Sequence, residues 1–244
     1  MRALVVSDIH ANLTALEAVL QDAGNVDEIW CLGDMIGYGP DPNEVVELIR
    51  QLPNLTCCIL GNHDVALLGE MDFAVFNTEA RKSLLWQQES ISSENLDYLR
   101  GLPQDSLVRD KVTLAHGSPR DPVWEYILNT LIARLNFEAF ETPYCFVGHS
   151  HIQCYFQLDV ARDRVSLEFP GVNQLVRLNP RAILNPGSVG QPRDRDPRAS
   201  YAIYDSDGDT WQPRRASYDV GAVQKRIRAA GLPEKHAARL ADGW

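Results

Sequence analysis

The chain has 244 residues, a formal net charge of −10 and a hydrophobic fraction of 45%, which is ordinary for a soluble globular protein. The acidic balance disfavours nucleic acid as a partner, because binding to its backbone needs patches of Lys and Arg. No apolar run approaches the roughly 18 residues needed to cross a bilayer. The N-terminus runs directly into an apolar segment, so we expect neither a signal peptide nor a membrane partner.

The first 65 residues alternate between strand-like and helix-like segments. The run Leu4–Val6 predicts a buried strand, and the helix after it is predicted to start at Asn12 and stop at Gly24. This order implies parallel strands joined by right-handed crossovers. Strands are predicted at residues 2–7, 28–32 and 55–60, with the second helix at 44–52.

A polar cluster follows each of these three strands. The clusters are Ser7-Asp8-Ile9-His10, Gly33-Asp34 and Gly61-Asn62-His63-Asp64. Ligand sites in open α/β sheets gather at the carboxyl ends of the strands, so we expect the three clusters to meet in space.

The rest of the chain predicts a second sheet. We expect helices over residues 77–100, with a break near Ser93, and over 127–140. Strands at 107–108, 112–115 and 144–147 lead into His116-Gly117 and Gly148-His149-Ser150-His151. Later short alternating runs predict antiparallel strands, with a hairpin turn at Asp207-Gly208 and closing helices at 219–230 and 234–241. We expect one α/β domain over residues 1–244, with two packed sheets.

Five of the six histidines fall inside these polar clusters. Aspartate and histidine bind divalent transition metals, whereas thiolates would indicate structural zinc. Seven ligands are too many for one tetrahedral ion, but they suit two ions about 3.5–4 Å apart that share a carboxylate. The candidate ligands are Asp8, His10, Asp34, Asn62, His116, His149 and His151.

The remaining titratable candidates are interpreted as structural. His236, on an amphipathic C-terminal helix, is interpreted as packed or solvent-exposed. The five cysteines lie in or beside apolar segments without a C-x-x-C spacing, so we interpret them as buried thiols of a protein in the reducing cytoplasm. They are Cys31, Cys57, Cys58, Cys145 and Cys154.

The ordered blocks across residues 8–151 resemble the calcineurin-like metallophosphoesterases, in particular small bacterial and archaeal members. All five blocks are present in order, and no ligand position is substituted. The resemblance implies a four-layer α-β-β-α sandwich of two mixed sheets. It also implies that His63 assists catalysis and that the ions are Mn, Fe, Zn or Ni. One ion would be held by Asp8, His10 and His151, the second by Asn62, His116 and His149, and both by Asp34.

The chemistry of the residues agrees with this resemblance. Two dications against Asp8 and Asp34 leave a positive site for a phosphoester. A water that bridges two metals loses a proton near neutral pH and becomes the nucleophile that attacks phosphorus. His63 can then stabilise the developing charge or protonate the leaving oxygen, and we expect Asp64 to orient His63.

Substrate contacts are predicted at three residues. Tyr38 follows Asp34, and its ring either stacks on a leaving group or packs. Arg120, near Trp124, is expected close to the metals. Arg193, after the polar turn 185–192, either contacts phosphate or belongs to a solvated mixed-charge loop.

The sequence therefore predicts a dinuclear-metal hydrolase of phosphodiesters or small phosphomonoesters. A protein phosphatase, a dinucleoside polyphosphatase and a nuclease stay open, with the acidic charge against the nuclease. The alternative outside enzymes is a protein-binding scaffold of the same fold, like a retromer subunit of the family. The intact ligand set favours the enzyme, and no oligomeric state is indicated.

Overall fold

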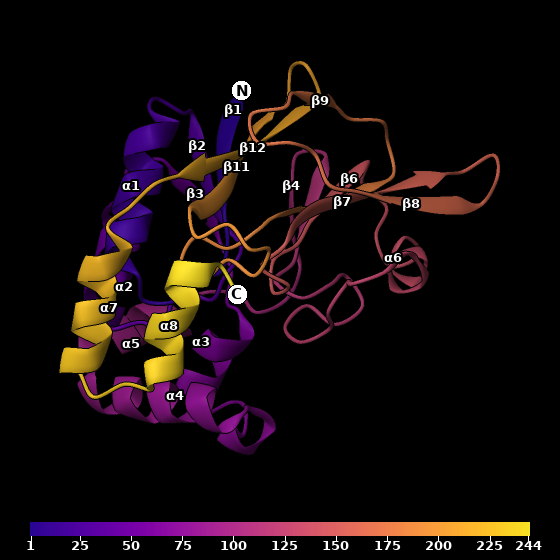
Figure 1. Cartoon of the computed structure of the whole chain (residues 1–244). Helices are drawn as coiled ribbons and strands as arrows, with labels where there is room; N and C mark the ends of the chain where they lie inside the picture. The colour runs from indigo at the N-terminus through magenta and orange to yellow at the C-terminus, as the bar shows by residue number, and fades with distance from the viewer.

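The protein, described here over residues 1–244 by a computed structural model, contains two six-stranded sheets flanked by helices (Figure 1). The strand order is β3-β2-β1-β11-β12-β9 in the first sheet and β4-β5-β6-β10-β7-β8 in the second. The strands are β1 Arg2–Val6, β2 Glu28–Cys31, β3 Leu55–Cys58, β4 Leu107–Arg109, β5 Val112–Leu114, β6 Tyr144–Phe146, β7 Gln153–Asp159, β8 Arg164–Glu168, β9 Val176–Arg177, β10 Ala182–Pro186, β11 Ala199–Asp205 and β12 Thr210–Ala216. The helices are α1 Leu13–Ala23, α2 Pro42–Gln51, α3 Asn62–Leu67, the 3₁₀ helix η1 Phe73–Val75, α4 Thr78–Ser90, α5 Ser93–Arg100, α6 Thr130–Asn136, α7 Val220–Ala229 and α8 Glu234–Asp242.

The parallel arrangement predicted for the first three strands is confirmed. β1 pairs in parallel with β2, and β2 with β3. α1 begins where the Asn12 side chain accepts a hydrogen bond from Ala15 N at 3.1 Å, and it ends at Gly24, which has φ 64°. α2 starts at Pro42, two residues before the predicted start, because proline is well tolerated in the first turn of a helix.

The later strands depart from the prediction in one pairing. β11 and β12 form the expected antiparallel hairpin around Asp207-Gly208. β10, however, runs parallel to β6 and antiparallel to β7. The long excursion through β7, β8 and β9 lets the chain return in the same direction as β6, so both sheets are mixed.

Three apolar cores separate four layers. Successive side chains of a strand point to opposite faces, so Leu4 and Val6 pack toward the helices while Ala3 and Val5 pack toward the second sheet. A third core lies between the second sheet and α6. The predicted α-β-β-α sandwich is thus confirmed.

The helix predicted at 127–140 is shorter in the structure, where α6 spans Thr130–Asn136. α6 starts only after Asn129, whose side chain accepts from Ile132 N at 3.0 Å. The preceding residues form a loop instead, and Trp124 O of this loop accepts a hydrogen bond from the His149 ring.

The short helix α3 was absent from the predicted elements. All six of its residues are buried, so it has no alternation of apolar and polar positions to reveal it. α3 begins at Asn62, at the carboxyl end of β3, and carries His63 in its first turn. None of the helices has the length and apolar composition of a membrane span. The single domain over residues 1–244 stays a prediction.

Candidate metal centre

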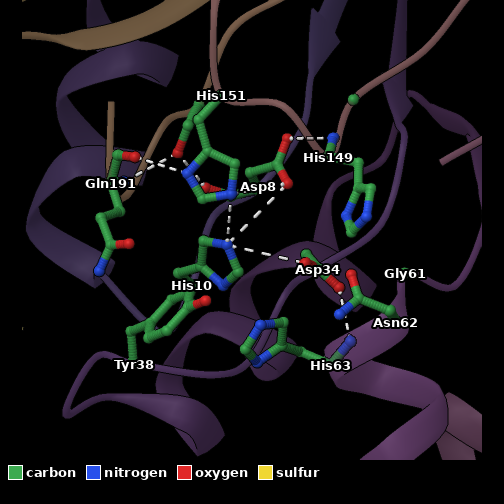
Figure 2. A network of polar contacts seen from close by, with 12 residues as sticks. Asp8, His10, Asp34, Tyr38, Gly61, Asn62, His63, His149, His151 and Gln191 are labelled. Atoms are coloured by element: carbon green, nitrogen blue, oxygen red, sulfur yellow. Dashed lines mark hydrogen bonds and ion pairs between the residues drawn. The ribbon is translucent and has the colours of Figure 1, made fainter. Parts of the chain in front are cut away.

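The loops that follow β1, β2, β3, β5 and β6 bring all seven predicted ligands together, and Figure 2 shows many of these side chains pointing toward one another. Each of the seven is at most 2% exposed. Three groups have all donor atoms within 4.8 Å of one another. The first is Asp8, His10 and His151, the second is Asp34, His116 and His149, and the third is His10, Asp34 and His63. Asn62 Oδ1 joins the second group, 3.2 Å from His116 Nε2.

Four imidazole rings are fixed by backbone carbonyls. A carbonyl oxygen only accepts hydrogen bonds, so the ring nitrogen facing it carries the hydrogen, and the other nitrogen faces the cluster. The four contacts are His10 Nδ1 to Ile36 O at 2.9 Å, His116 Nδ1 to Leu32 O at 2.8 Å, His149 Nε2 to Trp124 O at 3.0 Å, and His151 Nδ1 to Gln191 O at 2.6 Å. Such contacts orient metal-ligating histidines.

In each of the two carboxylates, one oxygen accepts a backbone hydrogen bond and the other faces the cluster. Asp8 Oδ2 accepts from His149 N at 3.0 Å, which leaves the buried Oδ1 without a hydrogen-bond donor, 3.2 Å from His151 Nε2. Asp34 Oδ1 accepts from His63 N at 2.8 Å. Asp34 Oδ2 lies 3.7 Å from His10 Nε2 and 3.4 Å from His116 Nε2, so it faces both groups at once.

The first group fits a cation because the ring nitrogens that face the cluster carry no proton. Burial lowers the pKa of His10 to about 3, although Asp34 opposes this, and burial also lowers the pKa of His151 well below its ordinary value. Their Nε2 atoms are nevertheless only 3.1 Å apart. Two lone pairs facing each other at this distance repel unless a positive ion lies near both.

The second group attracts positive charge directly. Burial lowers the pKa of His149, but at His116 the charge and hydrogen bond of Asp34 outweigh burial and raise the pKa to about 10. The donor chemistry of both groups fits divalent metal ions.

The backbone is strained at the same residues. Asp8, His10, Asp34, His149 and His151 have φ between 48° and 64°, a region that costs a non-glycine residue about 1–2 kcal/mol. Outliers of this kind concentrate at functional sites.

Most glycines beside the cluster are needed because a side chain would not fit, and fewer because of an unusual backbone angle. Gly33 has φ 92°, whereas a Cβ at Gly61 would lie 2.1 Å from Asp34 Oδ1 and one at Gly148 would lie 1.9 Å from Ser7 Oγ. Only a residue without a side chain lets these loops approach so closely.

His63 lies beside the cluster, as predicted. Its ring centroid is 4.9 Å from that of His10 and 4.5 Å from that of Tyr38, and its buried Nδ1 has no hydrogen-bond partner. Burial, and then the charges of His10 and Arg193, lower the pKa of His63 well below its ordinary value, so the free protein holds it neutral.

The Asp64 carboxylate is occupied by backbone donors, so the expectation that it orients His63 stays a prediction. The Asp64 carboxylate accepts from Gly61 N at 3.0 Å, from Ile36 N at 3.2 Å and from Met35 N at 3.3 Å. Asp64 is the third residue of α3, where an acidic side chain reaches back to the N-cap backbone. These contacts hold the loop after Asp34 against the start of α3.

The three predicted substrate residues lie in different surroundings. Tyr38 is 8% exposed and packs against His10, which favours its packing role. The Arg193 side chain points inward, and its Nη2 donates a hydrogen bond to Tyr38 Oη at 3.3 Å. Because Tyr38 packs against His10, this contact disfavours the alternative of a solvated loop residue. Arg120 pairs with Glu125 at 3.5 Å and has no hydrogen bond or ion pair to the cluster, so its role stays a prediction.

Two aromatic residues around the cluster, Tyr126 and Phe76, were missed by the sequence analysis. The Tyr126 ring stacks on His149, with centroids 3.6 Å apart, and Phe76 lies 4.9 Å from His63. Trp124, expected near the metals, is 5.9 Å from His149. His236 is buried, and its ring lies 5.0 Å from that of Tyr38, so this histidine is packed and not solvent-exposed. The only sequence signal for the stacking of Tyr126 on His149 is that Tyr126 follows the His116 block closely in the chain.

The model of the calcineurin-like phosphoesterase superfamily domain matches residues 1–209. The chain belongs to this superfamily. The resemblance predicted from the five blocks is confirmed, and so is the enzyme class, a metal-dependent phosphoester hydrolase. The crystal structure of a metallophosphoesterase from Sphaerobacter thermophilus matches this phosphoesterase with a TM-score of 0.90 and 49% sequence identity, over 100% of this chain and 99% of the other.

Other relatives show how far the similarity extends. An uncharacterized protein of Methanocaldococcus jannaschii is 37% identical over 243 residues, which cover 97% of this phosphoesterase and 96% of the relative. A hypothetical protein from Pyrococcus horikoshii shares the fold, with a TM-score of 0.79 and 23% identity over 100% of this chain and 98% of that one. A symmetrical bis(5'-nucleosyl)-tetraphosphatase of Erwinia tasmaniensis is 28% identical over 138 residues, 55% of this chain and 50% of that enzyme.

Proposed function

We propose that this phosphoesterase uses two divalent metal ions to hydrolyse phosphodiesters or small phosphomonoesters. The observation that supports two ions is Asp34 Oδ2, which faces His10 of one donor group and His116 of the other at 3.7 and 3.4 Å. A carboxylate oxygen in this position suits a bridging ligand. A site for one ion would not need a second complete group of donors.

The proposed ligand sets follow the two groups. One ion would be held by Asp8, His10 and His151, the other by Asn62, His116 and His149, and both by Asp34. The mixed nitrogen and oxygen donors suit Mn, Fe, Zn or Ni. When bound, such ions would offset the negative charge of the phosphate and lower the pKa of a coordinated water molecule.

The chain's own residues supply the remaining functions. The carbonyl contacts of the four imidazoles keep the ligand nitrogens aimed at the cluster before substrate arrives. Arg193 can donate hydrogen bonds to phosphate oxygens. Neutral His63 can donate a hydrogen bond to the leaving oxygen, where negative charge develops.

Dinucleoside polyphosphates are the second candidate substrate class. A relative over about half of this chain is a symmetrical bis(5'-nucleosyl)-tetraphosphatase. The rings of Tyr126 and Trp124 beside His149 offer an aromatic surface that suits a nucleobase. The protein-binding scaffold is disfavoured because the ligand set is complete and buried. All five cysteines are free and buried, which supports a cytoplasmic location.

The test is hydrolysis of bis-p-nitrophenyl phosphate and p-nitrophenyl phosphate by protein loaded with Mn²⁺. We expect turnover of at least one ester, its loss after treatment with a chelator, and its recovery when Mn²⁺ is restored. Metal-loaded protein that is inactive on both esters would favour the scaffold and overturn the proposal.

A further inference from the structure

Two arginines beside the cluster have no acidic partner. The Arg193 side chain donates hydrogen bonds to Tyr38 Oη and Gln191 Oε1, each at 3.3 Å, and forms no ion pair. The side chain of Arg239 makes no hydrogen bond or ion pair, and the Nε atoms of both arginines are buried without a partner. A buried donor on a positive group is costly when it stays unpaired, and a bound anion would supply the acceptor that the protein does not.

Other arginines of the same helical hairpin are paired. Arg226 on α7 donates to both carboxylate oxygens of Asp41, at 2.9 and 2.8 Å. Arg228 makes the equivalent contact with Glu234. The unpaired state of Arg239 is therefore specific to its position on α8 and is not a general property of the hairpin.

Contacts through Tyr38 place the face of α8 that carries Arg239 near the cluster. The Tyr38 ring lies 4.6 Å from that of His10 and 5.0 Å from that of His236 on α8, and the Arg193 guanidinium lies 5.8 Å from its centroid. Arg239 follows His236 by three residues, so both project from the same face of α8.

The end of α8 packs against the loop that follows Arg193. A Cβ added at Gly243 would lie 2.6 Å from the backbone nitrogen and carbonyl carbon of Asp196. Gly243 follows Arg239 by about one helical turn, and Asp196 follows Arg193 by three residues. Arg239 and Arg193 therefore belong to two segments that contact each other.

The element that carries Arg239 is firmly held. α7 and α8 enclose a small apolar core of their own, which includes Val223, Ile227 and Leu240. The end of α8 is tied to the loop after Arg193 by a hydrogen bond from Arg195 N to Gly243 O at 2.7 Å. In Figure 1 the hairpin lies on the helical side of the first sheet, and the C-terminus ends near the loops between strands. A binding group on such a rigid element is well placed before substrate arrives.

We propose that Arg193 and Arg239 form an anion subsite for the phosphate adjacent to the one that is cleaved. The preferred substrate would then carry two or more linked phosphates, as in a nucleoside or dinucleoside polyphosphate. This inference rests on the proposed phosphoesterase function and narrows its substrate class. α8 lies beyond residues 1–209, which match the superfamily domain, so the subsite adds a specificity element to the shared cluster.

The kinetic test compares Arg239→Ala with the matched control Arg228→Ala on two substrates. Bis-p-nitrophenyl phosphate has one phosphate, and a dinucleoside tetraphosphate has four. We expect Arg239→Ala to raise KM for the tetraphosphate about 10- to 100-fold, the range of a lost charge-assisted hydrogen bond, with little change in kcat. The constants for the diester, and all constants of Arg228→Ala, should stay at wild-type values. Equal effects on both substrates, or none on the tetraphosphate, would overturn the subsite.

A binding measurement separates this inference from the hydrolase proposal. Tripolyphosphate is titrated calorimetrically into metal-loaded protein from which free metal has been removed, using wild type, Arg239→Ala and Arg239→Lys. We expect about 10-fold weaker binding for the alanine variant and partial recovery with lysine, which restores the charge. If wild type binds in this way but hydrolyses no ester, the subsite stands and the hydrolase fails. If wild type hydrolyses esters while all three proteins bind tripolyphosphate equally, the subsite is wrong; thermal melting confirms that each variant is folded.

Discussion

The metal cluster and the α7–α8 hairpin are ordered by different forces. The cluster is polar and buried, and five of its seven ligands have left-handed backbone angles. The hairpin consists of regular amphipathic helices around an apolar core. The cluster depends on the exact placement of each atom, because each imidazole and carboxylate uses one polar atom for a backbone partner and directs the other at the cluster. The hairpin tolerates more change, and it contributes one charged side chain toward the cluster. Substitutions should therefore have large effects in the first region and graded effects in the second.

Asp34→Asn should have the largest effect, because it removes the only carboxylate that faces both donor groups. The amide keeps the size of the side chain but loses the negative charge that stabilises two cations. We expect turnover to fall at least about 1,000-fold, the scale on which single electrostatic groups act, and bound metal to drop by at least one ion. Steady-state kinetics and elemental analysis measure both. A variant with normal metal content and normal turnover would remove Asp34 from the proposed mechanism.

His63→Ala should separate catalysis from metal binding. His63 lies beside the cluster but belongs to neither proposed ligand set, so both ions should remain bound. General acid–base assistance is worth roughly 10²–10⁴ in rate, and we expect kcat to fall within that range. Turnover at the wild-type level would show that His63 has no catalytic role.

His236→Gln should change the acid stability that the hairpin confers. Burial lowers the pKa of His236 to about 4, while the unfolded chain keeps a value near 6.5. Its contribution is therefore fully present above pH 6.5 and is lost as the pH falls toward 4. Wild type should lose up to about 3 kcal/mol more unfolding free energy than the variant between pH 7 and pH 4. Urea melts at both pH values measure this, and parallel pH profiles would show that His236 is not the titrating group.

Gly61→Ala should have a smaller effect, confined to the cluster side. An added Cβ would lie 2.5 Å from the backbone nitrogen of Asp34, and overpacking of this kind costs about 1–3 kcal/mol. Gly208→Ala is the matched control, because its Cβ would meet nothing closer than Thr210 Cγ2 at 3.4 Å. Thermal melting should show a lower Tm for the first variant only. Equal melting temperatures would mean that the loops after β2 and β3 adjust without strain.

The sequence could predict those parts of the cluster that follow directly from where strands end. The apolar runs Leu4–Val6 and Glu28–Leu32 fix where strands end, and parallel strands bring the residues after them to one edge, so the positions of Asp8 and Asp34 follow from pattern alone. The resemblance then assigned the ligand groups, and the observed donor distances fit that assignment.

Other features depended on contacts that no local pattern contains. Asp64 follows His63 directly, yet the helical turn sends its carboxylate to the backbone of the Asp34 loop. α3 is too short and too uniformly buried to show a helical period. Arg239 lies 46 residues after Arg193 in the sequence, and only the packing of α8 on Tyr38 brings it toward the cluster.

The account depends on two cations bound by one continuous set of donors. A crystal structure of Mn²⁺-loaded protein, with anomalous scattering data collected at the manganese edge, locates the ions without assumptions about activity. We predict two anomalous peaks per chain, about 3.5–4 Å apart, with the Asp34 carboxylate between them. A single peak, or peaks away from these seven side chains, would contradict the account.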